Sequence, residues 1–169
     1  ASRHRCRVVA LERHAGRAAG ASRLMRRLGL GNRVTIVRAD ATALPFAAGR
    51  FDACLSQEAL LHVEDKAAVL AECHRTLVPG GRLAFTDWIA HGGLGARERE
   101  RLHEWMAATT LQSLDGYRTL LGRAGFGVTQ ALSPRYVTVA TFFWESPAVV
   151  LALGAAAVLA RWGTGRGRV

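Results

Sequence analysis

The stretch that decides the fold runs from FDACLSQEALLHVEDK, Phe51–Lys66, to HRTLVPGGRLAFTDW, His74–Trp88. Each of these two segments contains a short apolar run that is typical of a buried strand, Phe51–Leu55 in the first and Arg82–Trp88 in the second. Between them, Lys66–Leu77 has the spacing of an amphipathic helix, and a Pro-Gly-Gly turn ends it. This order predicts a βαβ unit with two parallel strands.

The same alternation extends toward the N-terminus. Two runs of apolar and β-branched residues, Arg7–Leu11 and Arg33–Arg38, flank a helical pattern over Ala15–Leu28. Strands that alternate with helices in this way predict an α/β fold, a Rossmann-like doubly wound sheet that is mostly parallel. Ligands of such sheets bind at the carboxyl ends of the strands.

The pattern is less regular after residue 90. We expect helices over Arg97–Thr110, Tyr117–Ala124 and Ala148–Arg161, and an outer strand over Gly127–Leu132. The last helix is apolar on all sides, but it falls short of the roughly 20 apolar residues that span a bilayer, so we expect it in the core. The chain is therefore divided into a core over residues 1–132 and a helical extension of the same domain over residues 133–169.

Charge and cysteine content narrow the class of protein. The net charge is +10, and Lys66 is the single lysine among many arginines. The arginines are spread along the chain without interleaved aromatic residues, which argues against nucleic-acid binding. Three cysteines with no CxxC pair predict reduced thiols in a cytoplasmic protein, without disulfides or zinc. No stable membrane span and no signal peptide are expected.

Acidic residues follow two of the predicted strands. Glu12 comes directly after Arg7–Leu11, where a carboxylate can accept both hydroxyls of a ribose. Asp40 follows the next strand, and it can accept the exocyclic amine of an adenine while apolar neighbours such as Leu44 flank the ring. Either acid taken alone is equally typical of a solvated strand end.

Four stretches in this order, RVVALE, ADATALPF, FDACLSQEALLHVEDK and HRTLVPGGRLAFTDW, resemble the small-molecule class I S-adenosylmethionine-dependent methyltransferases. The chain looks most like the sarcosine/dimethylglycine, phosphoethanolamine and natural-product sugar O-methyltransferases, over about Arg7 to Phe126. The resemblance implies transfer of a methyl group from S-adenosylmethionine to a nitrogen, oxygen or carbon atom of a small molecule.

The resemblance also implies which residues bind the cofactor. Glu12 would hold its ribose, Asp40 and Ala41 its adenine end, and Ser56 and Gln57 would line its sulfonium and methionine end. Leu44 belongs to the same cofactor-binding set.

Catalytic roles are implied for His62 and Asp87, and Tyr117 matches a tyrosine that contacts substrate. Histidine titrates near neutral pH, so His62 could accept the proton of an attacking amine or hydroxyl. Asp87 matches the acid that partners this base in some relatives, and it could fix the tautomer of the imidazole. Taken alone, His62 is more typical of a histidine at a helix start that a backbone carbonyl satisfies, and only the resemblance makes the two interpretations equal.

The usual first strand of this family and its GxGxG loop have no counterpart in the sequence, because Gly16 and Gly20 fall inside a predicted helix. The missing strand would lie between Arg7–Leu11 and Phe51–Leu55, and its loss leaves backbone groups unpaired. The sequence is then a truncated piece, the two half-sheets pair directly, or a partner chain supplies the strand. We favour the first, in which case the chain as given binds the cofactor poorly.

Three other functions are considered. A nicotinamide-dependent oxidoreductase would use the same strand order, but the Pro-Gly-Gly turn and the lack of a Tyr-xxx-Lys pair argue against it. A non-catalytic methyltransferase-like subunit that completes its sheet with a partner chain is the main alternative. Methylation of DNA bases is disfavoured because Ser56–Ala59 has neither the prolines nor the aromatic residue that hold a flipped base.

Overall fold

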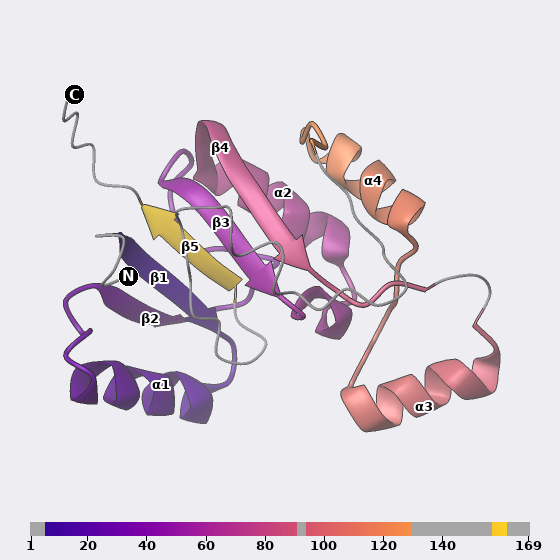
Figure 1. Cartoon of the computed structure of the whole chain (residues 1–169), viewed down its shortest axis with the longest axis horizontal. Helices are drawn as coiled ribbons and strands as arrows, with labels where there is room; N and C mark the ends of the chain where they lie inside the picture. The colour runs from indigo at the N-terminus through magenta and orange to yellow at the C-terminus, as the bar shows by residue number, and fades with distance from the viewer. Residues whose placement is uncertain (1–5, 91–93, 130–156, 162–169) are drawn as a thin grey trace.

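A five-stranded sheet organises the residues that the computed structural model describes, which are 6–90, 94–129 and 157–161 (Figure 1). Four strands run parallel to one another, and the fifth, the central strand β5 (Ala157–Arg161), runs antiparallel to both of its neighbours. The predicted α/β sheet is therefore confirmed for its four parallel strands. In spatial order the strands are β2 (Val34–Arg38), β1 (Arg7–Glu12), β5 (Ala157–Arg161), β3 (Phe51–Gln57) and β4 (Leu77–Thr86).

The helices follow the predicted positions with small shifts at their ends. Asp65 caps α2 (Lys66–Thr76) by accepting the backbone N–H of Ala68, and Ser113 caps α4 (Leu114–Arg123) by accepting that of Gly116. α3 ends four residues before its predicted end, because Ala107 adopts the left-handed conformation with φ +50°. The helices are α1 (Ala15–Arg27), the short 3₁₀ helix η1 (Leu60–His62), α2 (Lys66–Thr76), α3 (Ala96–Met106) and α4 (Leu114–Arg123).

The prediction of a Pro-Gly-Gly turn before the strand is wrong, because β4 already begins at Leu77 and contains these residues; their glycines have a steric reason. Gly80 has φ +76°, which an L-residue with a side chain rarely adopts. A Cβ atom on Gly81 would lie 2.8 Å from the carbonyl oxygen of Val78 and 3.2 Å from that of Asp52. The two glycines therefore fit the irregularity near the start of β4, where its pairing with β3 shifts register.

The prediction of a helix over Ala148–Arg161 is wrong for Ala157–Arg161, which form β5 in the centre of the sheet; residues 148–156 lie outside the described residues. β5 pairs with β1 from Arg7 to Ala10 and with β3 from Ala53 to Ser56. A short run that is apolar on all sides is as typical of a strand buried on both faces as of a buried helix, and here the open edges of β1 and β3 supply the partners.

β5 fills the position between β1 and β3 for which the sequence left three arrangements open. Direct pairing of the two half-sheets is not what the structure has, because β5 lies between them and pairs with each. The predicted outer strand over Gly127–Leu132 is wrong for residues 127–129, which are irregular, and its remainder lies outside the described residues.

The core lies where α2 and α4 cover the β3–β4 half of the sheet. Leu70 is 1% exposed, and truncating such a side chain to alanine costs about 2–5 kcal/mol. The Sγ atoms of Cys54 and Cys73 lie 3.5 Å apart in this core, and the hydrogen bond with Cys73, together with burial, raises the pKa of the Cys54 thiol. Among the described helices, none is long and apolar enough to cross a membrane.

Candidate active site

The carboxyl ends of the four parallel strands lie level along one edge of the sheet. Glu12 of β1 is paired with Arg38 of β2, and Gln57 of β3 is paired with Thr86 of β4. Val158 of β5 pairs with β1 two positions before Glu12, and it pairs with β3 two positions before Gln57. β5 therefore holds the two halves of the sheet at the same level. Neighbouring strands are spaced about 4.8 Å apart, so these strand ends form a row about 20 Å long.

Glu12 lies at the end of β1 with a largely buried carboxylate that already has three donors. The backbone N–H of His14 donates to Oε1 at 2.7 Å, and the Arg17 guanidinium donates to Oε1 and Oε2 at 3.0 Å each. Burial raises the pKa of Glu12, but the hydrogen bonds from Arg17 and His14 outweigh it, so the pKa lies below its ordinary value. The carboxylate is therefore ionised at neutral pH.

Asp40 lies just beyond β2 and closes a local turn. Its Oδ1 accepts the backbone N–H of Thr42 at 2.9 Å and the Thr42 hydroxyl at 2.8 Å, and Oδ2 lies 3.8 Å from the guanidinium of Arg13. The backbone hydrogen bond from Thr42 is the main reason that the pKa of Asp40 is lowered. Ala41 packs half-buried against the core beside it.

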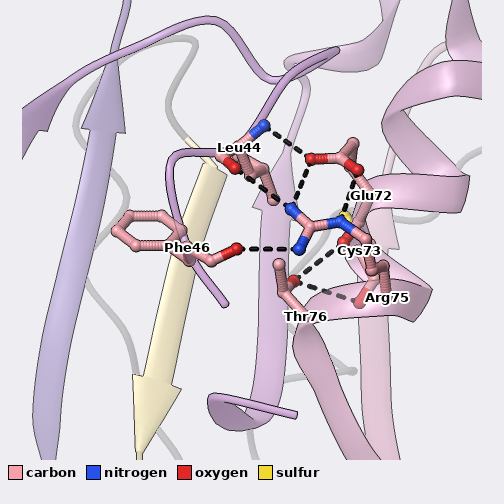
Figure 2. Close-up of polar contacts among 6 residues, drawn as sticks. All are labelled: Leu44, Phe46, Glu72, Cys73, Arg75 and Thr76. Atoms are coloured by element: carbon pink, nitrogen blue, oxygen red, sulfur yellow. Dashed lines mark hydrogen bonds and ion pairs between the residues drawn. The ribbon is translucent and has the colours of Figure 1, made fainter. Parts of the chain in front are cut away.

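The loop that carries Leu44 is held by a clamp on the last turns of α2 (Figure 2). Glu72 accepts the backbone N–H of Leu44 at 2.7 Å. The guanidinium of Arg75 donates to the carbonyl oxygens of Leu44 and Phe46, at 3.0 and 2.8 Å, and to both oxygens of Glu72. The side chain of Leu44 is itself buried in the core, so the clamp fixes the path of the loop that follows Asp40.

Ser56 and Gln57 end β3. The Oγ atom of Ser56 is buried and has no hydrogen-bond partner among the described residues. A buried hydroxyl without a partner costs free energy, so its position at a strand end marks a place where a polar ligand atom would be stabilised. Gln57 is half-buried at the next position and paired in the sheet with Thr86.

His62 and Asp87 are not hydrogen-bonded to each other. Nδ1 of His62 lies 3.1 Å from the carbonyl oxygen of Ala107, and Asp87 accepts the backbone N–H of Leu61 at 3.0 Å. The expectation that Asp87 fixes the tautomer of His62 is thus wrong in this structure. The histidine follows the plainer interpretation, in which a backbone carbonyl satisfies it, because the segment after α3 passes directly beside η1.

The partner of Asp87 is Tyr117 of α4, whose hydroxyl donates to Oδ2. Tyr117 is 4% exposed, and its ring packs 5.1 Å from that of Phe85. Burial raises the pKa values of both groups, and the bond with Asp87 raises that of Tyr117 further. The tyrosine therefore lies in the core beside the strand edge, with its hydroxyl directed to Asp87.

Lys66 is the residue of this region that sequence reasoning missed. It is 2% exposed, and its Nζ donates to the carbonyl oxygens of Leu60 and Val63 at 2.6 and 2.8 Å and to Oγ1 of Thr110 at 2.8 Å. Burial lowers the pKa of Lys66, and the nearby charge of Asp87 acts in the opposite direction. A single lysine in an arginine-rich chain was the available signal, since a compact ammonium suits a small buried cage.

Lys66 and Asp87 together hold η1 at the strand edge. Lys66 donates to carbonyl oxygens near the two ends of η1, and Asp87 accepts the backbone N–H of Leu61 between them. On the other side, the backbone N–H of Thr109 donates to the Leu61 carbonyl oxygen at 2.8 Å. The position of His62 is therefore set by a buried cation, a half-buried carboxylate and the segment that follows α3.

Comparison with known proteins gives the family that the sequence resembles. A sequence profile described as "Methyltransferase domain" matches residues 1–85, just over half of the chain. Methyltransferase GfsG of Streptomyces halstedii is 34% identical over 105 residues, which are 60% of this chain and 38% of that protein. The chain spans less than half the length of that relative.

Solved structures share the fold. A protein assigned as a sarcosine dimethylglycine methyltransferase from Galdieria sulphuraria superposes with a TM-score of 0.62 and 26% identity, covering 68% of this chain and 43% of that one. A geranyl diphosphate methyltransferase in complex with S-adenosylmethionine gives a TM-score of 0.63 at 23% identity, covering 70% and 48%. The profile match and the level strand ends lead to one conclusion: the chain belongs to the methyltransferase-domain family, with the Rossmann-like fold of the class I S-adenosylmethionine-dependent enzymes.

Proposed function

We propose that this chain transfers the methyl group of S-adenosylmethionine to a nitrogen, oxygen or carbon atom of a small molecule. The observation that carries the proposal is the level row of strand ends, which brings Glu12, Asp40, Gln57 and Asp87 to one edge of the sheet. A ligand that lies along this edge meets ionised carboxylates at one end and a buried hydroxyl near the other.

We assign residues along this row to the adenosyl cofactor. Glu12 would accept the ribose hydroxyls, Asp40 and Ala41 would flank the adenine, and Leu44 would define the loop beyond it. Ser56, whose buried hydroxyl has no partner among the described residues, would donate to the methionine end beside Gln57. When bound, S-adenosylmethionine supplies an electrophilic methyl group on a sulfonium centre.

His62 is the proposed general base. An attacking amine or hydroxyl must lose a proton as it takes the methyl group, and a histidine near neutral pH can accept that proton. Since Nδ1 of His62 faces the carbonyl oxygen of Ala107, a neutral ring there carries its proton on Nδ1 and keeps Nε2 as the acceptor. Asp87 acts through η1, by holding the backbone N–H of Leu61, and not on the imidazole itself.

A non-catalytic subunit that completes its sheet with a partner chain is less well supported. That function needs facing strand edges that are open to another protein. Here β5 pairs with both β1 and β3, so those two edges are already used within the described chain.

Isothermal titration calorimetry with S-adenosylmethionine and S-adenosylhomocysteine tests the proposal. We expect both to bind, and we expect Glu12→Ala to weaken binding at least about ten-fold, because a charge-assisted hydrogen bond to the ribose is lost. Glu64→Ala, which changes an exposed acid outside the strand edge, is the matched control. An absence of heat up to millimolar ligand would overturn the proposal for this chain.

A further inference from the structure

A pocket of about 400 Å³ lies beyond the end of β4, between the segment after that strand and α3. Another wall is formed by the segment that follows α3. This segment pairs with the chain after β4 through a bridge between Ile89 and Gln112, and the backbone N–H of Ala90 donates to the Gln112 carbonyl oxygen. The volume suits a drug-sized small molecule. Its lining residues are Ala90, Leu94, Arg99, Leu102 and Ala108 through Gln112.

The pocket is joined to the proposed base by short contacts. Ala108, which lines it, directly follows Ala107, whose carbonyl oxygen contacts His62. Thr110, another lining residue, accepts a hydrogen bond from the buried Lys66. A molecule in the pocket would therefore lie beside the segment that holds His62, at the β4 end of the row of strand ends and away from Asp40 on the β2 side.

The lining combines apolar and polar groups in nearly equal measure, with one cation. Alanine and leucine side chains form its apolar part, and Thr109, Thr110 and Gln112 add uncharged polar groups. Arg99 is the charged member. Its Nη2 donates to the carbonyl oxygen of Leu94 at 2.5 Å, and it makes no ion pair with a described residue.

The acids next to Arg99 on α3 do not neutralise it. Oε2 of Glu98 accepts the backbone N–H of Gly95 at 2.7 Å, at the start of the helix, and Glu100 has no ion pair with Arg99. The guanidinium thus makes no ion pair with a described residue at the rim of this pocket, and guanidinium groups bind carboxylates and phosphates in a planar, bidentate manner.

We propose that this pocket binds the methyl acceptor, and that the acceptor is a small molecule with an apolar part and a carboxylate or phosphate group that Arg99 binds. The proposal rests on the proposed methyltransferase function and adds the substrate class to it. The apolar body lies against Leu94, Leu102 and Leu111, and the anionic group lies at the rim formed by α3.

Binding of three probes with the same alkyl chain tests the proposal: decanoate, decyl phosphate and decanol, each titrated below its micelle concentration. We expect the two anions to bind more tightly than decanol. Arg99→Gln should weaken the anions about five-fold or more and leave decanol unchanged, since only the charge-assisted contact is lost. Arg97→Gln removes an equal charge from α3 outside the pocket lining and should leave all three affinities unchanged.

Ala90→Phe, which places a ring in the pocket, should abolish binding of all three probes while the circular dichroism spectrum stays native. Equal weakening by Arg97→Gln and Arg99→Gln, or equal affinities for decanol and the anions, would overturn the proposal. Titration with S-adenosylhomocysteine separates the two hypotheses: cofactor binding without probe binding contradicts only the pocket, and probe binding without cofactor binding contradicts only the methyltransferase function.

Discussion

Arg17 binds both carboxylate oxygens of Glu12, with one hydrogen bond of 3.0 Å to each. Oε1 also accepts the backbone N–H of His14, so only Oε2 retains a free acceptor position. A ribose that offers two hydroxyls to this carboxylate must therefore displace part of the Arg17 contact. The Arg17 side chain is 64% exposed, so it can leave Glu12 for water at little cost.

We accordingly predict that Arg17→Gln raises the affinity for S-adenosylhomocysteine. The gain should be less than about ten-fold, because an ion pair with an exposed partner is weak. Calorimetric Kd values measure it, and Arg23→Gln, on an exposed position of the same helix, serves as the control. A loss of affinity in Arg17→Gln alone would instead show that Arg17 helps to hold the cofactor.

The Glu12–Arg17 pair also predicts a pH dependence of stability. The pKa of Glu12 in the folded chain lies below its ordinary value of about 4.3. The pair therefore stabilises the fold fully above that pH, and the stabilisation is lost as the pH falls through the lowered pKa of the folded chain. Urea unfolding at several pH values should show wild type and Glu12→Gln converging as the pH falls below about 4.3 and through the lowered pKa of the folded chain. A difference that stays constant over this window would contradict the assignment.

The four parallel strands and the helices between them could be predicted because their periodicity is local. The strand-end acids followed from the same reasoning, since the end of a parallel strand fixes where Glu12 and Asp40 must lie. The contacts of these acids could not be predicted. Whether Glu12 meets Arg17, or Asp87 meets Tyr117, depends on helix packing and side-chain rotamers that no spacing in the sequence records.

β5 was missed for a different reason. Its five residues are apolar apart from Arg161, and such a run fits a buried helix or a central strand equally well. The strand forms because β1 and β3 present backbone groups that need partners, which is a property of the assembled sheet and not of the segment. Lys66 was missed likewise, because only the folded chain shows its three acceptors.

His62→Asn tests the base without removing the local contact. Asparagine retains a side-chain donor for the Ala107 carbonyl oxygen but cannot accept a proton near neutral pH. We expect turnover with a panel of small-molecule acceptors to fall about 100-fold or more. The Kd for S-adenosylmethionine should stay within about two-fold of wild type, since a base contributes to the transition state and not to ground-state binding. Equal losses in both quantities would argue against a base.

Lys66→Met should destabilise the fold by roughly 2–4 kcal/mol, because three buried or half-buried acceptors and the charge of Asp87 lose their cation. Chemical denaturation measures the loss, and hydrogen exchange at the Thr109 amide should quicken more than exchange in α1. Glu64→Gln, an exposed neighbour, should change the free energy of unfolding by less than about 0.5 kcal/mol. Unaltered stability in Lys66→Met would mean that the cage contributes nothing.

Tyr117 should remain protonated in strongly alkaline solution. Burial and the bond with Asp87 raise its pKa well above the ordinary value of about 10, so it stabilises the fold below that pH and the stabilisation is lost as the pH rises above it. The chain has two tyrosines, Tyr117 and Tyr136, so Tyr136→Phe leaves a single phenol to follow. Its phenolate absorbance should appear only together with alkaline unfolding. Ionisation of the phenol in a chain that is still folded would contradict the burial of this pair.

The central place of β5 has a consequence for the order of events during synthesis. Its partners in β1 lie about 150 residues earlier in the chain, and those in β3 about 100 residues earlier. Both half-sheets therefore emerge from the ribosome well before the strand that joins them. Until then the edges of β1 and β3 that β5 later occupies stay unpaired in the nascent protein. During this interval chaperones or a strand of another protein would compete for them.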